Sequence, residues 1–222
     1  MRFISTLLFL AALAPSPAAA QPASDTTKLP PAVRIPRERE IALARSAAPK
    51  AVSDSAEIWV LGDNGFEKAV GGTSGYGCIV QRGLGGQHII PRCDDRSGVE
   101  SHYAVYQLIE RMRLAGRTYG DARKAIADGF RDGTIKEPKF GGFSYMYSVD
   151  GAFKTPTGSA KFSPHVMIYW PNCNAKQLGV GSSAGMSGSG LAFIDYGTPE
   201  CVLVVNTPPG TARPSVDSTA KP

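Results

Sequence analysis

The chain has 222 residues, of which 42% are hydrophobic and 19% are charged, and its formal net charge is +5. This hydrophobic share excludes a wholly disordered chain, and the composition as a whole excludes a coiled coil, a helical solenoid and a collagen-like rod. With 25 Gly and 17 Pro residues, the chain is expected to form one loop-rich domain.

The N-terminus has the three parts of a secretory signal peptide. Arg2 supplies a positive charge, an apolar run of about a dozen residues follows, and residues 18–20 are small alanines. The alternative, a membrane anchor, needs about 20 apolar residues. We therefore predict a signal peptide over 1–20, cleavage before Gln21, and a periplasmic or secreted protein without an integral membrane segment after signal removal.

The rest of the chain divides by composition. Residues 21–36 are rich in Pro, Ala, Ser and Thr, which is typical of a flexible leader. Residues 206–222 hold four prolines and few apolar side chains, which predicts a disordered tail. Between them, 37–205 is predicted to be a single domain.

The domain opens with a predicted helix over 37–47. Asn64-Gly65 then separates two apolar runs, at 58–61 and 66–70, and this dipeptide is a strong hairpin signal. A further strand is predicted at 76–82. Together these segments predict a meander of three antiparallel strands.

Two helices follow. Ser97 and Glu100 have capping-box spacing, and apolar residues recur at helical spacing up to Gly116, which is predicted to end the helix. Thr118 and Asp121 repeat the capping pattern for a second helix, so the pair forms a helical hairpin.

The last third returns to strands, predicted at 143–149, 165–170, 191–196 and 201–205. The run at 201–205 is apolar without alternation, as expected of a central strand. Strands, helices and strands in this order predict an α+β fold, with an antiparallel sheet and an inserted helical hairpin.

The four cysteines of an exported chain can form two disulfides, and three pairings are possible. Pairing neighbours joins Cys78 to Cys93 and Cys173 to Cys201. A redox site would need a C-x-x-C motif, and a zinc site would need a His at ligand spacing. The sequence has neither, nor a Walker, Rossmann, zincin or haem motif, so we predict no metal and no cofactor.

Several segments together resemble a group of uncharacterised secreted bacterial proteins. They are EIALARSAAP at 40–49, GYGCIV at 75–80, PRCD at 91–94, the helical hairpin, YM at 145–146, PHVMIY at 164–169 and GTP at 197–199. The resemblance covers most of 40–205, and the Gly/Ser-rich stretch at 181–190 departs from it. It implies one exported domain and no particular activity.

His165 is the residue that best suits a functional role. In a strand over 165–170, His165, Met167 and Tyr169 share one face, which could line a pocket. Tyr145 belongs to a similar aromatic stripe. We take Tyr145, His165 and Tyr169 as candidate binding residues and His165 as a candidate catalytic acid or base. The alternative is a His that caps a strand end beside Pro164.

The serine motifs are weaker evidence for a catalytic site than His165 is. Residues 181–185 match G-x-S-x-G around Ser183, but the flanking strand and helix of a nucleophile elbow are missing, and all three His residues precede Ser183. Ser187 stands in a segment similar to that of chymotrypsin-like proteases, but Met186 replaces the usual Asp. We predict a flexible loop here.

The remaining polar residues favour structural roles. His102 is predicted to be a packed, hydrogen-bonded ring, and the acidic pair Asp94-Asp95 complements a helix N-terminus or binds a cation. Basic residues gather on the helical hairpin without a nucleic-acid-binding module, so no nucleic-acid partner is predicted.

Two main hypotheses of function follow, and a purely structural envelope module is a third. The first is an exported, non-enzymatic domain that binds a small molecule or an envelope component. The second is a hydrolase-like enzyme with His165 as acid or base and Ser183, Ser187 or Asp94 as its partner. The sequence leaves open whether the protein is an enzyme.

Overall fold

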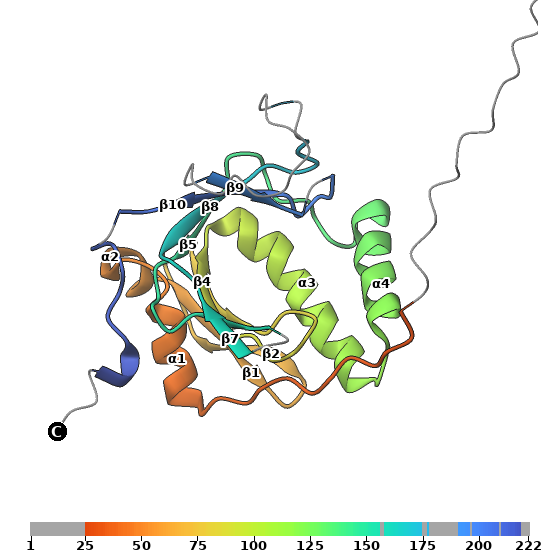
Figure 1. Cartoon of the computed structure of the whole chain (residues 1–222), viewed down its shortest axis with the longest axis horizontal. Coiled ribbons are helices and arrows are strands. Elements are labelled where there is room, and N and C mark those ends of the chain that lie inside the picture. The colour runs from red at the N-terminus through yellow and green to blue at the C-terminus, as the bar shows by residue number, and fades with distance from the viewer. Residues whose placement is uncertain are drawn as a thin grey trace, which may run out of the picture.

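The computed structural model describes residues 25–155, 158–174, 177, 191–195, 197–208 and 210–218. The predicted signal peptide over 1–20 and the serine motifs at 181–190 lie outside these residues. The predicted α+β fold is confirmed: helices combine with a mostly antiparallel sheet, and a helical hairpin is inserted between two strands (Figure 1).

Along the chain, the helices and strands occur in the following order. They are α1 (Arg37–Arg45), α2 (Lys50–Ser53), β1 (Glu57–Gly62), β2 (Gly65–Val70), β3 (Gly77–Gln81), β4 (Ile90–Asp94), α3 (Arg96–Leu114), α4 (Tyr119–Asp132), β5 (Phe143–Met146), β6 (Ala152–Thr155), β7 (Gly158–Lys161), β8 (His165–Tyr169), β9 (Leu191–Ile194), β10 (Val202–Asn206) and the 3₁₀ helix η2 (Val216–Ser218).

Eight strands form one sheet in the order β2-β1-β3-β4-β5-β8-β10-β9. β1 and β2 form the predicted hairpin, but β3 pairs with β1 in parallel, so the predicted antiparallel meander is wrong. The first four residues of β3 are all buried. A strand of this kind needs neighbours on both edges and cover on both faces, and the hairpin signal at Asn64-Gly65 carries no information about that pairing. β6 and β7 form a separate hairpin that the sequence did not predict.

The helical hairpin joins β4 to β5, which are neighbours in the sheet. Ser97 does not cap α3, because Asp95 is the N-cap and its Oδ1 accepts from Gly98 N at 3.0 Å. The capping box at α4 is confirmed by two hydrogen bonds of 3.1 Å between Thr118 and Asp121. Gly116, with φ of 65°, follows the end of α3 as predicted.

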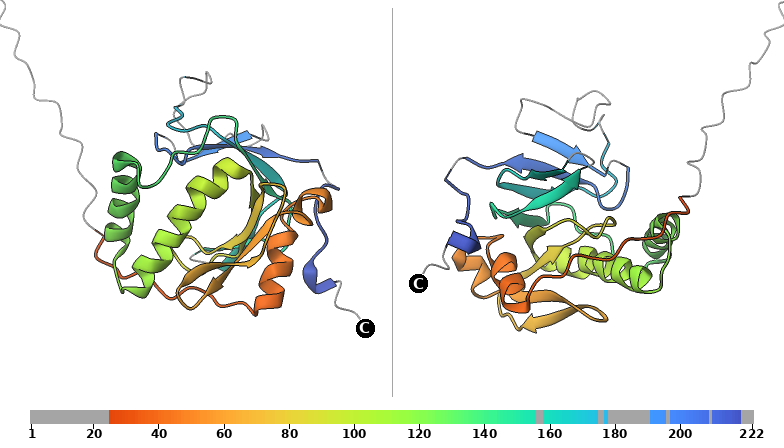
Figure 2. Two further views of the ribbon diagram at one scale, coloured as in Figure 1. Left: turned by 180° about the vertical axis from the view of Figure 1, so that it is seen from behind. Right: turned by 60° about the horizontal axis from the view of Figure 1, so that its bottom comes forward.

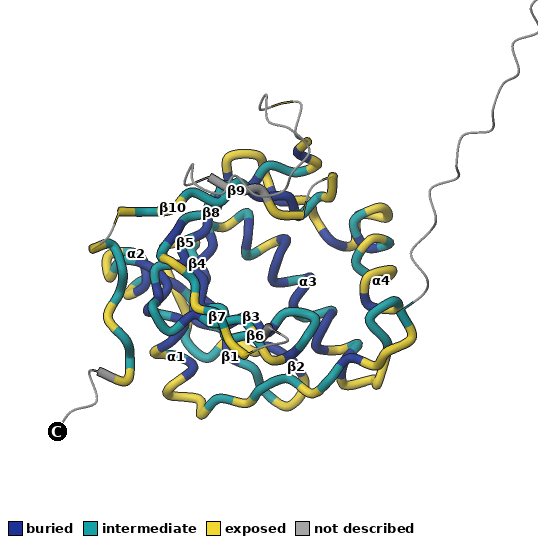
Figure 3. Tube along the Cα trace, in the orientation of Figure 1, coloured by how far each residue is buried: buried dark blue, intermediate teal, exposed yellow. Residues whose placement is uncertain are grey.

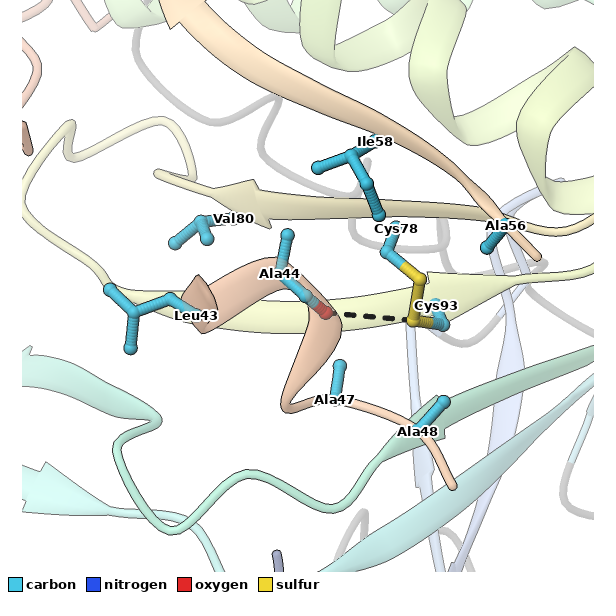
Figure 4. Close-up of a cluster of buried hydrophobic side chains, with 9 residues drawn as sticks. All are labelled: Leu43, Ala44, Ala47, Ala48, Ala56, Ile58, Cys78, Val80 and Cys93. Atoms are coloured by element: carbon cyan, nitrogen blue, oxygen red, sulfur yellow. Dashed lines mark hydrogen bonds between the residues drawn. A yellow bond between two sulfur atoms is a disulfide. The ribbon is translucent and has the colours of Figure 1, made fainter. Parts of the chain in front are cut away.

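Helices cover both faces of the sheet. The sheet curves around α3, which packs on its concave face, while α1 packs on the opposite face against β1, β3 and β4 (Figures 1 and 2). On the α1 side, small and aliphatic side chains surround the Cys78–Cys93 disulfide (Figure 4). The tube view shows that α3 is more deeply buried than α4 (Figure 3).

The segment predicted as a flexible leader packs on the domain from residue 25 onward. Leu29 is buried, and the backbone N–H of Leu29 donates to Arg117 O at 2.9 Å. Arg82 Nε donates to Val33 O at 2.9 Å, and Arg113 donates to Pro30 O. The two side-chain contacts come from Arg82 and Arg113, buried arginines far along the chain, which local composition does not reveal.

Part of the segment predicted as a disordered tail also packs on the domain. Asp150 holds it, since its carboxylate accepts from Ser215 Oγ at 2.6 Å and from Val216 N at 2.8 Å. The η2 turn then lies beside α1 (Figure 2). In the described part of the chain, no helix combines the length and the apolar character needed to cross a bilayer.

Candidate functional site

A cavity of about 230 Å³ opens between α3 and the β5-β8-β10 part of the sheet. We call it the central pocket. Its polar lining comprises Gln81, Arg92, His102, Tyr106, His165, Asp195 and Glu200. Its apolar lining comprises Ile90, Met146, Phe162, Met167, Ile194 and Val202.

An ion pair lies beneath the pocket. Alternation along β4 puts Arg92 and Asp94 on the α3 face, where Arg92 Nε lies 3.0 and 2.9 Å from the two Asp94 carboxylate oxygens. Arg92 also donates to the Tyr106 hydroxyl, and the Tyr169 hydroxyl donates to Asp94 Oδ1 at 2.5 Å. Burial would raise the pKa of Asp94, but the charge and hydrogen bonds of Arg92 outweigh burial and lower that pKa.

Residues of α3 form the opposite wall of the central pocket. Gly98, His102 and Tyr106 recur every four residues on α3 and face the sheet. A Cβ atom at Gly98 would lie 2.2 Å from Tyr169 Oη, so only glycine lets the helix approach this closely. The His102 ring then packs 4.8 Å from the Tyr169 ring and 6.3 Å from the Tyr106 ring, centroid to centroid.

His102 has an unusual environment. Its side chain is 5% exposed, and its Nε2 atom has no hydrogen-bond partner within the described part of the chain. Its Nδ1 atom lies 3.9 Å from Glu200 Oε1, beyond hydrogen-bond distance. The prediction for His102 is therefore met in its packing, but the structure shows no hydrogen bond of the ring to any described residue. Burial and then the Arg92 charge lower the pKa of His102 to about 3, so the ring is neutral at pH 7.

Glu200 comes from the loop between β9 and β10, and its side chain is 27% exposed. Burial, and then the charge of Asp195, raise the pKa of Glu200 to about 7. Asp195 lies at the exposed rim and has a left-handed backbone, with φ of 58°.

The loop that carries Asp195 and Glu200 is fixed to the turn after β8. Asn172 N donates to Thr198 O at 2.8 Å, and Gly197 N donates to Cys173 O at 3.0 Å. The Cys173–Cys201 disulfide joins the same two segments, and the predicted pairing of both disulfides is found in the structure.

His165 lines the central pocket and is buried. Its Nδ1 lies 2.7 Å from Ser163 O, and burial lowers its pKa. The hydrogen bonds of Asp94 go to Arg92 and Tyr169 and not to His165. The other proposed partners, Ser183 and Ser187, lie outside the described residues.

The three candidate binding residues do not share one surface. Tyr169 lies on the same sheet face as His165, but its hydroxyl is held by Asp94. Tyr145 lies on the opposite face, directly across from Cys93, and packs edge-on against Phe143 at 4.6 Å. The structure thus brings His165 and Tyr169 together on one face and separates Tyr145 from them.

A wider groove of about 590 Å³ adjoins the central pocket. We call it the α4 groove. Asp195 and Glu200 line both spaces, so the two carboxyl groups stand where the groove meets the pocket. Ile126 and Phe130 of α4 provide apolar lining on the other side.

Sequence reasoning missed Arg92 and Glu200. Arg92 and Asp94 alternate in a short strand, and this spacing signals a pair on one face. Glu200 follows a Gly-Thr-Pro turn, where a charged residue ordinarily indicates surface, so nothing local points to it. Its position depends on the Cys173–Cys201 disulfide and the loop hydrogen bonds.

No three His, Cys, Asp or Glu side chains in the described ranges are grouped so as to hold a metal ion. No family model matches the chain, and no curated protein or solved structure matches it either. The resemblance to uncharacterised secreted proteins therefore stays a prediction.

Proposed function

We propose that the protein is an exported binding domain whose central pocket takes a small molecule that carries a primary amine. One observation carries the proposal: two carboxyl groups, those of Asp195 and Glu200, line the central pocket where it meets the α4 groove. Among the described residues, neither Asp195 nor Glu200 has an Arg or Lys nitrogen at ion-pair distance.

The charges of the lining favour a cation. Arg92 is the basic side chain of the lining, and Asp94 already pairs with it through two oxygens. His102 is neutral, so an ionised Asp195 and Glu200 leave the pocket with excess negative charge. An ammonium group would relieve the repulsion that helps to raise the pKa of Glu200. The His102 Nε2 atom offers a further hydrogen-bonding position.

The apolar part of the lining favours a ligand with a small apolar body. Its volume of about 230 Å³ lies below the about 300–1,000 Å³ of pockets for drug-sized ligands. Met146, Met167 and Val202 provide apolar walls, and Phe162 provides an aromatic one. A short alkyl or hydroxyalkyl amine matches this size and polarity.

The test compares three ligands of one shape: n-butylamine, n-butanol and butyrate at equal ionic strength. Nuclear magnetic resonance follows the ring signals of His102. We expect butylamine to shift them saturably, and butanol and butyrate to bind at least about tenfold more weakly, because a charge-assisted hydrogen bond contributes about 1.5–3 kcal/mol.

Glu200→Gln should lose this preference, whereas the matched control Glu38→Gln, at an exposed residue of α1, should keep it. Affinity for butylamine should rise from pH 5 to pH 8, since Glu200 must be ionised and its pKa is about 7. Equal binding of butanol and butylamine, or full binding by Glu200→Gln, would contradict the proposal.

The second candidate function is a hydrolase-like enzyme with His165 as acid or base. It is favoured by the position of His165 and Glu200 in one cavity, where two groups of different pKa can exchange protons with a substrate. This candidate predicts turnover of an amine-bearing ester or amide that is lost in a folded His165→Ala variant. Binding without turnover supports the first candidate.

Export is part of the proposal and rests on the signal-like N-terminus and on two disulfides, which persist in oxidising compartments. Protein recovered from the periplasm or the medium should begin at Gln21 and carry no free thiol. A chain that retains Met1 and four thiols in the cytoplasm would contradict this part.

A further inference from the structure

A second cavity, of about 270 Å³, lies between α1, α2 and the C-terminal segment. We call it the arginine cavity. Arg45 lines it from the last turn of α1, Lys50 from the first turn of α2, and Arg213 from the C-terminal segment. Asp54 is the acidic side chain of the lining. Figures 1 and 2 show the C-terminal segment running beside α1.

Arg45 and Arg213 both line the arginine cavity, and each has a buried donor. The Nε atoms of Arg45 and Arg213 are both buried, and neither has a hydrogen-bond partner in the part of the chain that the structure describes. Neither side chain forms an ion pair with a described residue, in contrast to the neighbouring Arg39, which pairs with Asp217 at 2.7 Å. A buried donor without a partner has a desolvation cost of about 1–3 kcal/mol that a bound acceptor removes.

The walls of the cavity are fixed by backbone contacts. Arg213 N donates to Tyr147 O at 2.8 Å, and Tyr147 N donates to Ala47 O at 2.9 Å. Asp150 holds the next residues of the segment through Ser215 and Val216. The macrodipole of α1 favours a cation at Arg45, but it does not explain a second arginine brought from the far end of the chain.

We propose that the arginine cavity binds a small molecule through a phosphate group. Three cationic side chains and one carboxylate leave a net charge that a dianion balances, and a phosphate carries about −1.5 to −2 at pH 7. A guanidinium presents its Nε–H and one Nη–H side by side, a geometry that suits phosphate oxygens. This site is separate from the central pocket and does not depend on the amine proposal.

The experiment titrates the purified protein with inorganic phosphate at pH 7 and constant ionic strength, and follows each arginine Nε–Hε signal by nuclear magnetic resonance. We expect saturable shifts at Arg45 and Arg213 and none at Arg117, an exposed arginine outside the cavity. Acetate, a monoanion, should not saturate the site. Unmoved signals at Arg45 and Arg213, shifts shared by Arg117, or equal binding of acetate would overturn the proposal.

Substitutions of Arg213 distinguish the effect of its positive charge from the effect of its hydrogen-bonding geometry. Arg213→Lys keeps the charge but removes the Nε–H, and Arg213→Gln removes both. We expect affinity to fall at least about tenfold in each, because each loses a charge-assisted hydrogen bond. Arg117→Gln makes the same charge change as Arg213→Gln and should bind normally, and Asp54→Asn should bind more tightly. Wild-type affinity in folded Arg213→Gln would overturn the proposal, and the wild-type titration tests it even if a variant does not fold.

Discussion

Glu200 destabilises the folded state at neutral pH. Its pKa is raised from 4.5 to about 7, so the folded protein holds the Glu200 proton more tightly than the unfolded chain does. The free energy of unfolding therefore falls as the pH rises from 4.5 to 7, and the loss is complete above that interval. A residue that weakens its own fold suits a binding role better than a structural one.

Glu200→Gln should remove this pH dependence. At pH 8 we expect the variant to be about 1–3 kcal/mol more stable than the wild type, since one pKa unit corresponds to about 1.4 kcal/mol and the side chain is 27% exposed. At pH 4.5 the two should be equally stable. Urea unfolding at both pH values measures the difference.

His102 contributes a second pH dependence of opposite direction. Its lowered pKa reduces stability as the pH falls below 6.5, and this loss is common to both proteins. The difference between wild type and Glu200→Gln therefore isolates Glu200. Equal stability of the two proteins at pH 8, with Glu38→Gln as the control, would contradict the assignment.

The sequence predicts the positions of some site residues, but it does not predict the surroundings of others. His165 and Tyr169 could be placed on one strand face because strand alternation is local. The environment of His102 could not be predicted, since its missing partner depends on Tyr106, Tyr169 and Glu200, which meet only in three dimensions. The same holds for Arg45 and Arg213, which are more than a hundred residues apart.

The position of helix α3 on the sheet depends on Gly98, which has no side chain. A Cβ atom at Gly98 would lie 2.2 Å from Tyr169 Oη and 2.7 Å from Asp94 Cβ. Both of these groups belong to the buried network beneath the central pocket. The helix therefore cannot keep its place over β4 and β8 with a larger residue at this position.

Gly98→Ala should destabilise the protein by about 1–3 kcal/mol, because inserting a methyl group into a closely packed interface forces neighbours apart. The matched control is Gly71→Ala, where a Cβ atom meets nothing within 4 Å and the backbone is not left-handed. Thermal and urea unfolding measure both. An unchanged Gly98→Ala variant would show that α3 tolerates a shift from Tyr169.

Local signals predicted the elements better than their pairing. The Asn64-Gly65 turn predicted β1 and β2, and the Thr118–Asp121 capping box predicted the start of α4, because each signal involves neighbouring residues. The parallel pairing of β1 with β3 was not predictable in this way. It depends on burial of β3 from both sides, which is set by α1 and α3 together.

The two disulfides have different structural roles in the molecule as a whole. Cys78–Cys93 joins adjacent strands inside the α1-side core, where the register of β3 and β4 is already set by their ladder (Figure 4). Cys173–Cys201 instead fixes the loop with Asp195 and Glu200 to the turn after β8. Removal of the second disulfide should therefore affect the central pocket.

We expect paired Cys→Ser changes at either disulfide to lower the free energy of unfolding by about 2–4 kcal/mol. Only Cys173→Ser/Cys201→Ser should also speed hydrogen exchange of the Gly197 amide, which donates to Cys173 O, and weaken amine binding, because the loop must then be ordered on binding. The Gly197 exchange rate tests the loop independently of any ligand. Equal exchange rates in the two variants would mean that the loop hydrogen bonds alone hold Glu200 in place, and the disulfide would then have no part in the site.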